Sequence, residues 1–419
     1  LGFLADTIYS YGGDVIAFAG DALLCVFQQD AEGIPTNSGK SFDFSSALMR
    51  AVQCAWFLKN HSSSTLTVHI GISCGEMSFA VLGGYRGKWT FLLNGSCITE
   101  LSSCVDDAKS KELVVTHALY DALAPNLDAD ITEVLELKSG NVKILKIKPK
   151  VVIYPSGERF ADSARDSSEE RTALAKVFVA APVIDALNLG QYHSFMSEVR
   201  EVTTMFIKLD SYSTVLHRNP ISLQSFFHHA QLCLADSGGF MRQFLIDDKG
   251  CVLILMWGVP SYSYGNNCSR AIRCADKLVT GVKPLNHSIS IGITTGNVFC
   301  GNVGSATRHD YVGIGHTVNL SARFMSKAHG QVLLDEATYN NLNASEKGCI
   351  KEGDHLWLKG VDHLVPSFSL GSLLMMRRAS AATNTSPVKD SADSALEDEF
   401  VSETARAVIS RQISKFDFI

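Results

Sequence analysis

The sequence predicts an α+β protein in which one βαββαβ-like unit occurs twice. Residues 70–95 and 291–315 both read Ile-Gly-Ile-x-x-Gly, followed by an apolar run, a polar turn, an aromatic residue and a closing glycine. Before each segment lie two β-type runs joined by a tight turn, and then a helical pattern. A repeat of this length indicates a duplicated domain and not a solenoid. We therefore expect two ferredoxin-like layers, each with helices on one face of its sheet.

Each copy is expected to contain, in order, a β-hairpin, a helix, the glycine motif, and a short strand that leads into a helix. In the first copy these elements are expected at residues 14–27, 44–60, 70–95 and 111–123. In the second copy they are expected at residues 242–258, 268–282, 291–315 and 330–342. The second copy opens with an additional strand at 202–210, for which the first copy has no counterpart.

The repeat sets the expected domain boundaries. We expect a first domain at 1–150, a structured linker at 151–195 and a second domain at 196–371. The tail at 372–419 is rich in Ser, Ala, Thr and Asp and has few large apolar residues, so we expect it to be disordered. Because the chain opens on Leu1 and not on Met, it is expected to be a piece of a longer protein.

The composition argues against several classes of function. The chain has 419 residues, of which 46% are apolar and 19% charged, as in an ordinary globular protein. A formal net charge of −6 argues against a nucleic-acid-binding surface. The 11 scattered cysteines include no Cys-x-x-Cys pair, which predicts a reduced, cytoplasmic protein without a zinc site. No apolar run approaches the length of a transmembrane helix.

Asp21 is a carboxylate within the apolar run VIAFAGDALLCVF. Burial of this charge is costly unless a partner neutralises it. One interpretation is a turn residue, because Gly-Asp is common at the tip of a hairpin. The other is a ligand of Mg²⁺, which takes hard oxygen donors, usually one or two carboxylates together with substrate phosphates.

Two further groups of residues could bind a ligand. The string GIGHTVNLSARF places Asn319 and Arg323 four residues apart, and hence on one helix face. They are either a solvated polar face or an amide and a guanidinium directed at one anion, since Arg suits phosphate geometry and phosphoryl transfer. Arg242 precedes a strand that ends in Asp247 and Asp248. These three residues are either edge and turn charges or a donor and an acceptor that flank a heterocycle.

Several strings together resemble the class III nucleotidyl cyclases: FAGDALL, the two Ile-Gly-Ile motifs, GSATRHDY, DYVGIGHTVNLSAR and, in the linker, YPSGE. The resemblance extends over about residues 1–370 and is nearest to the soluble, bicarbonate-responsive adenylyl cyclases. It implies two catalytic domains that form an intramolecular pseudo-dimer with the active site between them. It also implies conversion of ATP to 3′,5′-cyclic AMP and pyrophosphate with Mg²⁺, or with Mn²⁺ or Ca²⁺ as alternatives, in intracellular signalling.

The resemblance assigns roles to the charged residues. Asp21 matches one of two metal-binding Asp residues, and the other would lie on a strand upstream of Leu1. Asn319 and Arg323 match the pair that acts on the transition state, where Asn319 orients the ribose and Arg323 stabilises the developing charge.

The remaining residues carried over bind the substrate. Arg242 lies at or beside the position of a Lys that contacts adenine, and either Asp247 or Asp248 matches the Asp that does so. Gly313, which opens the turn before the helix, is assigned to the same side. His69 stands where the family has a phosphate-contacting Lys.

Three positions bear on the distinction between the copies and on regulation. Lys208 stands at the second copy's counterpart of the missing metal Asp, which agrees with this copy being the half without metal. Ala17 and Ser102 stand where, or near where, the family has bicarbonate-binding residues, which argues against direct activation by bicarbonate.

Two other functions are alternatives to an adenylyl cyclase. A catalytically degenerate pseudo-cyclase would bind a nucleotide or an ion and regulate an attached domain. A guanylyl cyclase is disfavoured by Asp at the acceptor position, where that class tends to use Glu and Cys.

Overall fold

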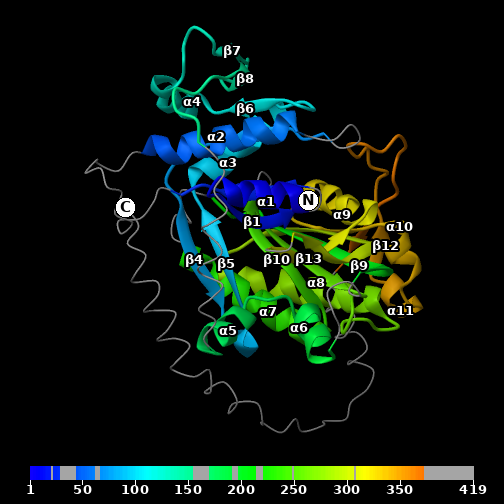
Figure 1. Cartoon of the computed structure of the whole chain (residues 1–419). Coiled ribbons are helices and arrows are strands. Elements are labelled where there is room, and N and C mark those ends of the chain that lie inside the picture. Colours follow the sequence, from blue (N-terminus) through cyan, green and yellow to red (C-terminus); the bar gives the residue numbers. More distant parts are fainter. Residues whose placement is uncertain are drawn as a thin grey trace, which may run out of the picture. The chain divides into compact units, whose positions relative to one another are not determined.

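The computed structural model describes residues 1–19, 22–28, 44–61, 67–153, 169–190, 197–213, 220–247, 250–305 and 308–371 (Figure 1). It confirms the α+β class. The chain divides into two compact units. Unit 1 comprises Leu1–Met77, Gly95–Ser167 and Gly301–Val312, and unit 2 comprises Ser78–Asn94, Ser168–Cys300 and Gly313–Ile419. The tail expected to be disordered, 372–419, lies outside the described residues.

The second copy forms one large sheet. Its strands are β9 (Glu198–Leu209), β10 (Phe240–Asp247), β11 (Gly250–Trp257), β12 (Ile289–Gly304), β13 (His309–Ile314), β14 (Val332–Leu334), β15 (Ile350–Glu352) and β16 (Phe368–Leu370). The order is β10-β11-β9-β12-β14-β16-β15, and β13 pairs with β12. The first four strands along the chain therefore lie in the spatial order 2-3-1-4, which is the βαββαβ layer expected from the sequence.

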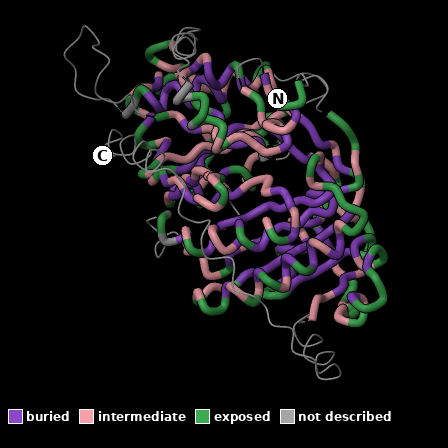
Figure 2. Tube along the Cα trace, turned by 90° about the horizontal axis from the view of Figure 1, so that it is seen from below, coloured by how far each residue is buried: buried purple, intermediate pink, exposed green. Residues whose placement is uncertain are grey.

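Helices cover both faces of this sheet. α7 (Gln224–Ser237) and α8 (Asn267–Val282) lie on one side of the strands and α9 (His316–Ala328) on the other (Figure 1). The short helices α10 (Glu336–Asn340) and α11 (Ala344–Lys347) follow. Because both faces are covered, residues 251–257 of β11 are all buried, which explains the continuous apolar run in the sequence (Figure 2).

The glycine of the Ile-Gly-Ile motif permits close helix–strand packing in each copy. A Cβ atom on Gly292 would lie 2.3 Å from the carbonyl oxygen of Ser321 and 2.4 Å from the amide nitrogen of Met325, both in α9. On Gly71 it would lie 3.0 Å from the Cβ atom of Cys104 and from the amide nitrogen of Val105. Any side chain at either position would push the helix away from its strand.

Unit 1 holds most of the first copy. Its strands are β1 (Asp14–Ala19), β2 (Ala22–Val26), β3 (Ile70–Ile72), β6 (Leu113–Val115), β7 (Glu133–Glu136) and β8 (Val142–Lys146). Its helices are α1 (Gly2–Ser10), α2 (Phe44–Asn60), α3 (Ser96–Asp107) and α4 (His117–Leu123). α2 and α4 share a buried core with β6 and β8, and Gly71 of β3 faces α3 instead.

The first-copy strands that lie within unit 1 form two separate sheets. β1 pairs with β2 alone, and the other sheet has the order β3-β6-β8-β7. In the second copy, β9 lies between the counterparts β11 and β12 and joins them. The described part of unit 1 has no strand in this place, which agrees with the expectation that the first copy lacks an opening strand.

The compact units do not coincide with the two copies. The hairpin of β4 (Ser78–Gly83) and β5 (Trp89–Asn94) belongs to the first copy in sequence but to unit 2 in space. The linker helices α5 (Glu169–Lys176) and α6 (Ala181–Asn188) also belong to unit 2. The domain limits drawn from the repeat therefore stay a prediction. None of the described helices has the length and apolarity that crossing a bilayer requires.

Candidate functional site

The candidate site is built on α9 of unit 2. β13 leads through Gly315, in an extended conformation, into the first turn of α9, where no side chain caps the free backbone N–H groups. Asn319 is exposed and Arg323, one turn later, is half-buried. The structure thus places the two residues on one helix, as the four-residue spacing requires.

Ser321 fixes the orientation of this helix face. Its hydroxyl oxygen lies 2.8 Å from the carbonyl oxygen of Gly292 in β12 and 3.1 Å from that of Thr204 in β9. It also accepts a hydrogen bond from the amide of Phe206 at 3.2 Å. Since Ser321 is fully buried against the sheet, Asn319 and Arg323 on either side of it are held on the outer part of the helix.

The guanidinium of Arg323 packs against a glycine of the loop before β16. A Cβ atom on Gly360 would lie 3.3 Å from Nη2 of Arg323, and Gly360 has a φ of +73°, which favours glycine. The Nη1 atom of Arg323 is buried and has no hydrogen-bond partner among the described residues. A buried, unpaired donor is costly, so this arrangement favours a ligand that supplies an acceptor.

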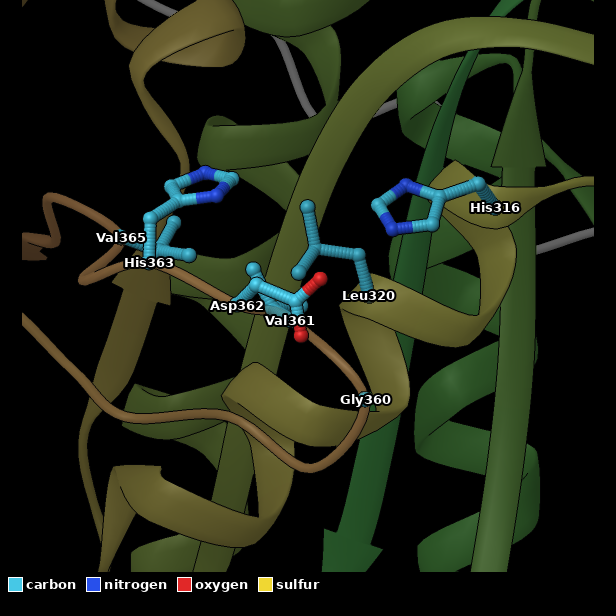
Figure 3. Close-up of a pocket in the computed structure, with 7 residues that line it drawn as sticks. All are labelled: His316, Leu320, Gly360, Val361, Asp362, His363 and Val365. Carbon is cyan, nitrogen blue, oxygen red and sulfur yellow. The ribbon is translucent and has the colours of Figure 1, made fainter.

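A cavity of about 310 Å³ lies between α9 and this loop (Figure 3). It is lined by His316, Leu320, Gly360, Val361, Asp362, His363 and Val365. His316 and Leu320 come from α9 and face the loop residues across the opening, where the Asp362 carboxylate and the His363 ring are directed towards it (Figure 3). The cavity combines an apolar floor with a few polar groups, which is typical of small-molecule sites.

The corresponding helix of the first copy has no such pair. α3 begins after Gly95, whose extended conformation matches that of Gly315, so Thr99 and Ser103 take the places of Asn319 and Arg323. The Ser103 hydroxyl accepts a hydrogen bond from the side-chain amide of Asn141 at 3.1 Å. Of the two helices, only α9 therefore presents an amide and a guanidinium together.

The candidate nucleobase residues lie on β10, also within unit 2. Arg242 lies at a β-bulge, because Met241 pairs with Leu255 in β11 while Gln243 pairs with Ile254. Bulges re-aim a side chain and are frequent beside binding sites. Asp247 ends β10, opposite Gly250, and its side chain lies outside the described residues, as does the whole of Asp248.

The remaining sequence candidates are more dispersed. Gly313 is buried, and a Cβ atom there would lie 2.5 Å from Cε of Met256, so the structure shows a packing role for it. His69 is exposed just before β3 in unit 1. Asp21 lies outside the described residues, between Ala19 of β1 and Ala22 of β2 in the sequence. No described group of three or more His, Cys, Asp or Glu side chains is arranged to hold a metal ion.

Sequence reasoning missed the loop side of the cavity. His316, Asp362 and His363 were not among the candidates, although the first of them stands within the quoted string GIGHTVNLSARF. For the loop the only signal is the Lys-Gly pair at 359–360, and short Lys-Gly pairs also occur in ordinary turns.

The comparison with protein families bears on this same region. Residues 266–368 match the model of the adenylate and guanylate cyclase catalytic domain. This part of the chain is thus similar to the catalytic domain of nucleotidyl cyclases. The matched segment contains α9 and the cavity, whereas Arg242 and Asp247 precede it.

Curated relatives extend the similarity to both copies. The chain is 24% identical over 369 residues to adenylate cyclase type 10 of Homo sapiens, a match that covers 81% of this chain and 22% of the relative. The enzyme of the same name from Oryctolagus cuniculus is 23% identical over 371 residues, with the same coverage. The chain thus spans 22% of the length of the curated relatives it matches.

Solved cyclase structures are also similar to part of the chain. The adenylyl cyclase CyaB from P. aeruginosa is 22% identical, with a TM-score of 0.38, over 42% of this chain and 95% of that chain. The guanylyl cyclase Cya2 is 23% identical, with a TM-score of 0.38 and the same coverage.

Proposed function

We propose that this chain is the catalytic region of an adenylate cyclase that converts ATP to 3′,5′-cyclic AMP and pyrophosphate. The observation that carries the proposal is the α9 face, where Asn319 stands one turn from a guanidinium whose buried Nη1 atom has no hydrogen-bond partner in the described part of the chain. A phosphate oxygen of the nucleotide would supply the missing acceptor, and Arg suits that geometry. The similarity to adenylate cyclase type 10 over 81% of the chain supports the same function.

The chain's residues would act at defined points of the reaction. The 3′-oxygen of ATP forms a bond to the α-phosphorus, the bond from that phosphorus to the bridging oxygen breaks, and pyrophosphate leaves. Negative charge is spread over the phosphate oxygens in the transition state. Arg323 would stabilise this charge, and Asn319 would orient the ribose through its side-chain amide.

A divalent ion at this site would need ligands from the substrate as well as from the protein. The described residues contain no set of three protein ligands, and Asp21 is the one carboxylate that the resemblance assigns to the metal. Mg²⁺ commonly binds through one or two carboxylates and the substrate phosphates, so this donor set is compatible with it. When bound, the ion would neutralise the phosphates and activate the attacking hydroxyl. Mn²⁺ and Ca²⁺ are the alternatives.

Base selectivity is assigned to β10. The guanidinium of Arg242, at the bulge, would be the donor to adenine, and the carboxylate of Asp247 or Asp248 would be the acceptor. A buried donor or acceptor left unpaired by the wrong base is what makes such sites selective. The intramolecular pairing of the two copies, a cytoplasmic location, and roles for His69 and Gly313 on the substrate side belong to the same proposal.

The test is nucleotide turnover by the full-length protein with ATP or GTP in Mg²⁺ or Mn²⁺. We expect cyclic AMP, and we expect Arg323→Ala and Asn319→Ala each to abolish it without loss of fold by circular dichroism. Lys327→Ala, an exposed change on the same helix, is the matched control and leaves the rate unchanged. Product from GTP alone would favour a guanylate cyclase, and no product from either would favour the pseudo-cyclase.

A further inference from the structure

Asp335 is a buried carboxylate that continues the pairing of β14 with β12 by one residue. β14 ends at Leu334, and the amide of Asp335 still donates to the carbonyl oxygen of Ile293 at 3.1 Å, as the next residue of a parallel strand would. Its own carbonyl oxygen turns away to accept from the amide of Tyr339 in α10. The side chain takes over the place of that carbonyl: Oδ2 of Asp335 lies 3.4 Å from the amide nitrogen of Thr295 in β12.

The hydrogen bonds of this side chain require its charged form. Oδ1 of Asp335 accepts from the amide of Thr338 at 2.9 Å, so that each carboxyl oxygen faces a backbone N–H. The Thr338 hydroxyl also bonds the carboxyl group and lies 2.8 Å from the hydroxyl of Thr295. A proton on either oxygen would place a second donor opposite an N–H. Asp335 is only 6% exposed, so these donors offset part of the cost of burying the charge.

The same segment of β12 carries the start of α9 on its other face. The hydroxyl of Thr294 donates to the carbonyl oxygen of Thr317 at 2.8 Å. A Cβ atom on Gly296 would lie 2.6 Å from Oγ1 of Thr317, and one on Gly315 would lie 3.1 Å from the carbonyl oxygen of Asn297. The path of β12 around Thr295 therefore determines where the chain enters α9.

The first turn of α9 depends on this contact more than the second turn does. No side chain caps the first turn, and the amides of Val318 and Asn319 share the carbonyl oxygen of Gly315, at 3.1 and 3.3 Å. The second turn is held separately, because Ser321 bonds the backbone of both central strands. A shift of β12 would thus move the turn that contains Asn319 and leave the rest of the helix in place.

The first copy has no second acceptor at the equivalent place. Thr116 stands there, and its amide donates to the carbonyl oxygen of Ile72 at 3.1 Å, as that of Asp335 does to Ile293. Its single side-chain oxygen accepts from the amide of Leu119 and so caps α4. The carboxylate therefore occurs only in the copy whose helix presents the amide and the guanidinium.

We propose that Asp335 is a positioning residue that fixes the first turn of α9, and with it Asn319, by holding β12 at Thr295. It acts through the strand and does not touch the substrate. Its effect on turnover rests on the proposed function, because misplacement of a group that orients a substrate slows the reaction. Its effect on α9 is measured without any substrate.

Hydrogen exchange of the full-length protein tests the effect on α9. Asp335→Asn keeps the size of the side chain but leaves one oxygen for two N–H donors. We expect the amides of Thr295 and Asn319 to exchange at least tenfold faster, while the amides of β11 keep their protection. Glu336→Gln, which removes the same charge from the exposed neighbouring residue, is the matched control and behaves as the parent.

Two further variants test the connection itself. Thr294→Val removes the bond to Thr317, so we expect faster exchange at Asn319 and unchanged exchange at Thr295. Combined with Asp335→Asn, it should add little at Asn319, because both changes act at one connection. If Asp335→Asn does not fold, Asp335→Thr decides, since it has the residue of the first copy and keeps an oxygen to cap α10.

Turnover separates positioning from a purely structural role. For Asp335→Asn we expect kcat for cyclic AMP formation to be at least fivefold lower, with KM for ATP within twofold of the parent. Unchanged exchange at Asn319 in a folded variant overturns the inference, and so does faster exchange there with unchanged kcat. If the parent makes no cyclic nucleotide, the proposed function fails, and the exchange at Asn319 still decides whether Asp335 positions α9.

Discussion

Gly360 offers a test of whether the loop beside α9 positions Arg323. Gly360→Ala introduces a side chain at a φ of +73°, which costs about 1–2 kcal/mol of stability in the left-handed region. The new Cβ atom would lie 3.3 Å from Nη2 of Arg323, so the guanidinium has to move by a few tenths of an ångström. Because misplacement of a charge-stabilising group lowers turnover, we expect cyclic AMP formation to fall at least tenfold.

Gly330→Ala separates strain from displacement. Gly330 follows α9 with a φ of +80°, and a Cβ atom there would meet nothing within 4 Å. We therefore expect the same loss of about 1–2 kcal/mol in urea unfolding, with the turnover rate per folded molecule unchanged. The reasoning is refuted if Gly360→Ala keeps full turnover, or if Gly330→Ala loses as much turnover as Gly360→Ala.

Three further predictions follow from the described contacts and the proposed function. Ser321→Ala removes a buried hydroxyl that bonds the backbone of both central strands, and we expect a loss of about 1–3 kcal/mol in urea unfolding; a loss below 0.5 kcal/mol would contradict this role. Burial raises the pKa of the Asp335 carboxyl above its ordinary value, although the hydrogen bonds from Thr338 and Thr295 act to lower it. The stability due to its protonation is thus present below the unfolded-state pKa and is lost as the pH rises through the folded-state pKa. Asp335→Asn should therefore gain stability relative to the parent as the pH is raised from acidic values towards 7, and parallel pH profiles of the two proteins would contradict the assignment. Removal of divalent ions with EDTA should abolish product formation, with recovery on addition of Mg²⁺ or Mn²⁺; turnover that persists in EDTA would exclude the metal-dependent reaction.

The fold class and the repeat could be predicted because they depend on local patterns. The apolar periodicity of 268–282 and the alternation of tight turns and β-type runs arise from residues close in sequence. The role of Gly292 could not be predicted in the same way. The repeated Ile-Gly-Ile motif shows that both copies have a glycine at this position. The reason for the glycine is the backbone of α9 at residues 321–325, which lies beside it in space but far from it in the sequence.

The candidate site could be predicted only where it depends on residues that are close in the sequence. Asn319 and Arg323 are neighbours on one helix, so their spacing alone places them together. The loop with Gly360 and Asp362 reaches α9 from some 40 residues further on, and nothing in its short sequence specifies that contact. The bulge at Arg242 depends on a register shift against β11, which only the paired strands reveal.

The gap in the first copy's sheet has a practical consequence for handling this protein. β2 and β3 each have one edge without a partner strand in the described structure, whereas β9 covers the corresponding edges in the second copy. Open edges are templates for any extended segment with free N–H and C=O groups. A polypeptide that starts at Leu1 leaves both edges open, so a purification tag of β-forming sequence at that end can pair with the first copy and change its solubility and its apparent oligomeric state. A strand upstream of Leu1, as the repeat leads us to expect, would take the same place.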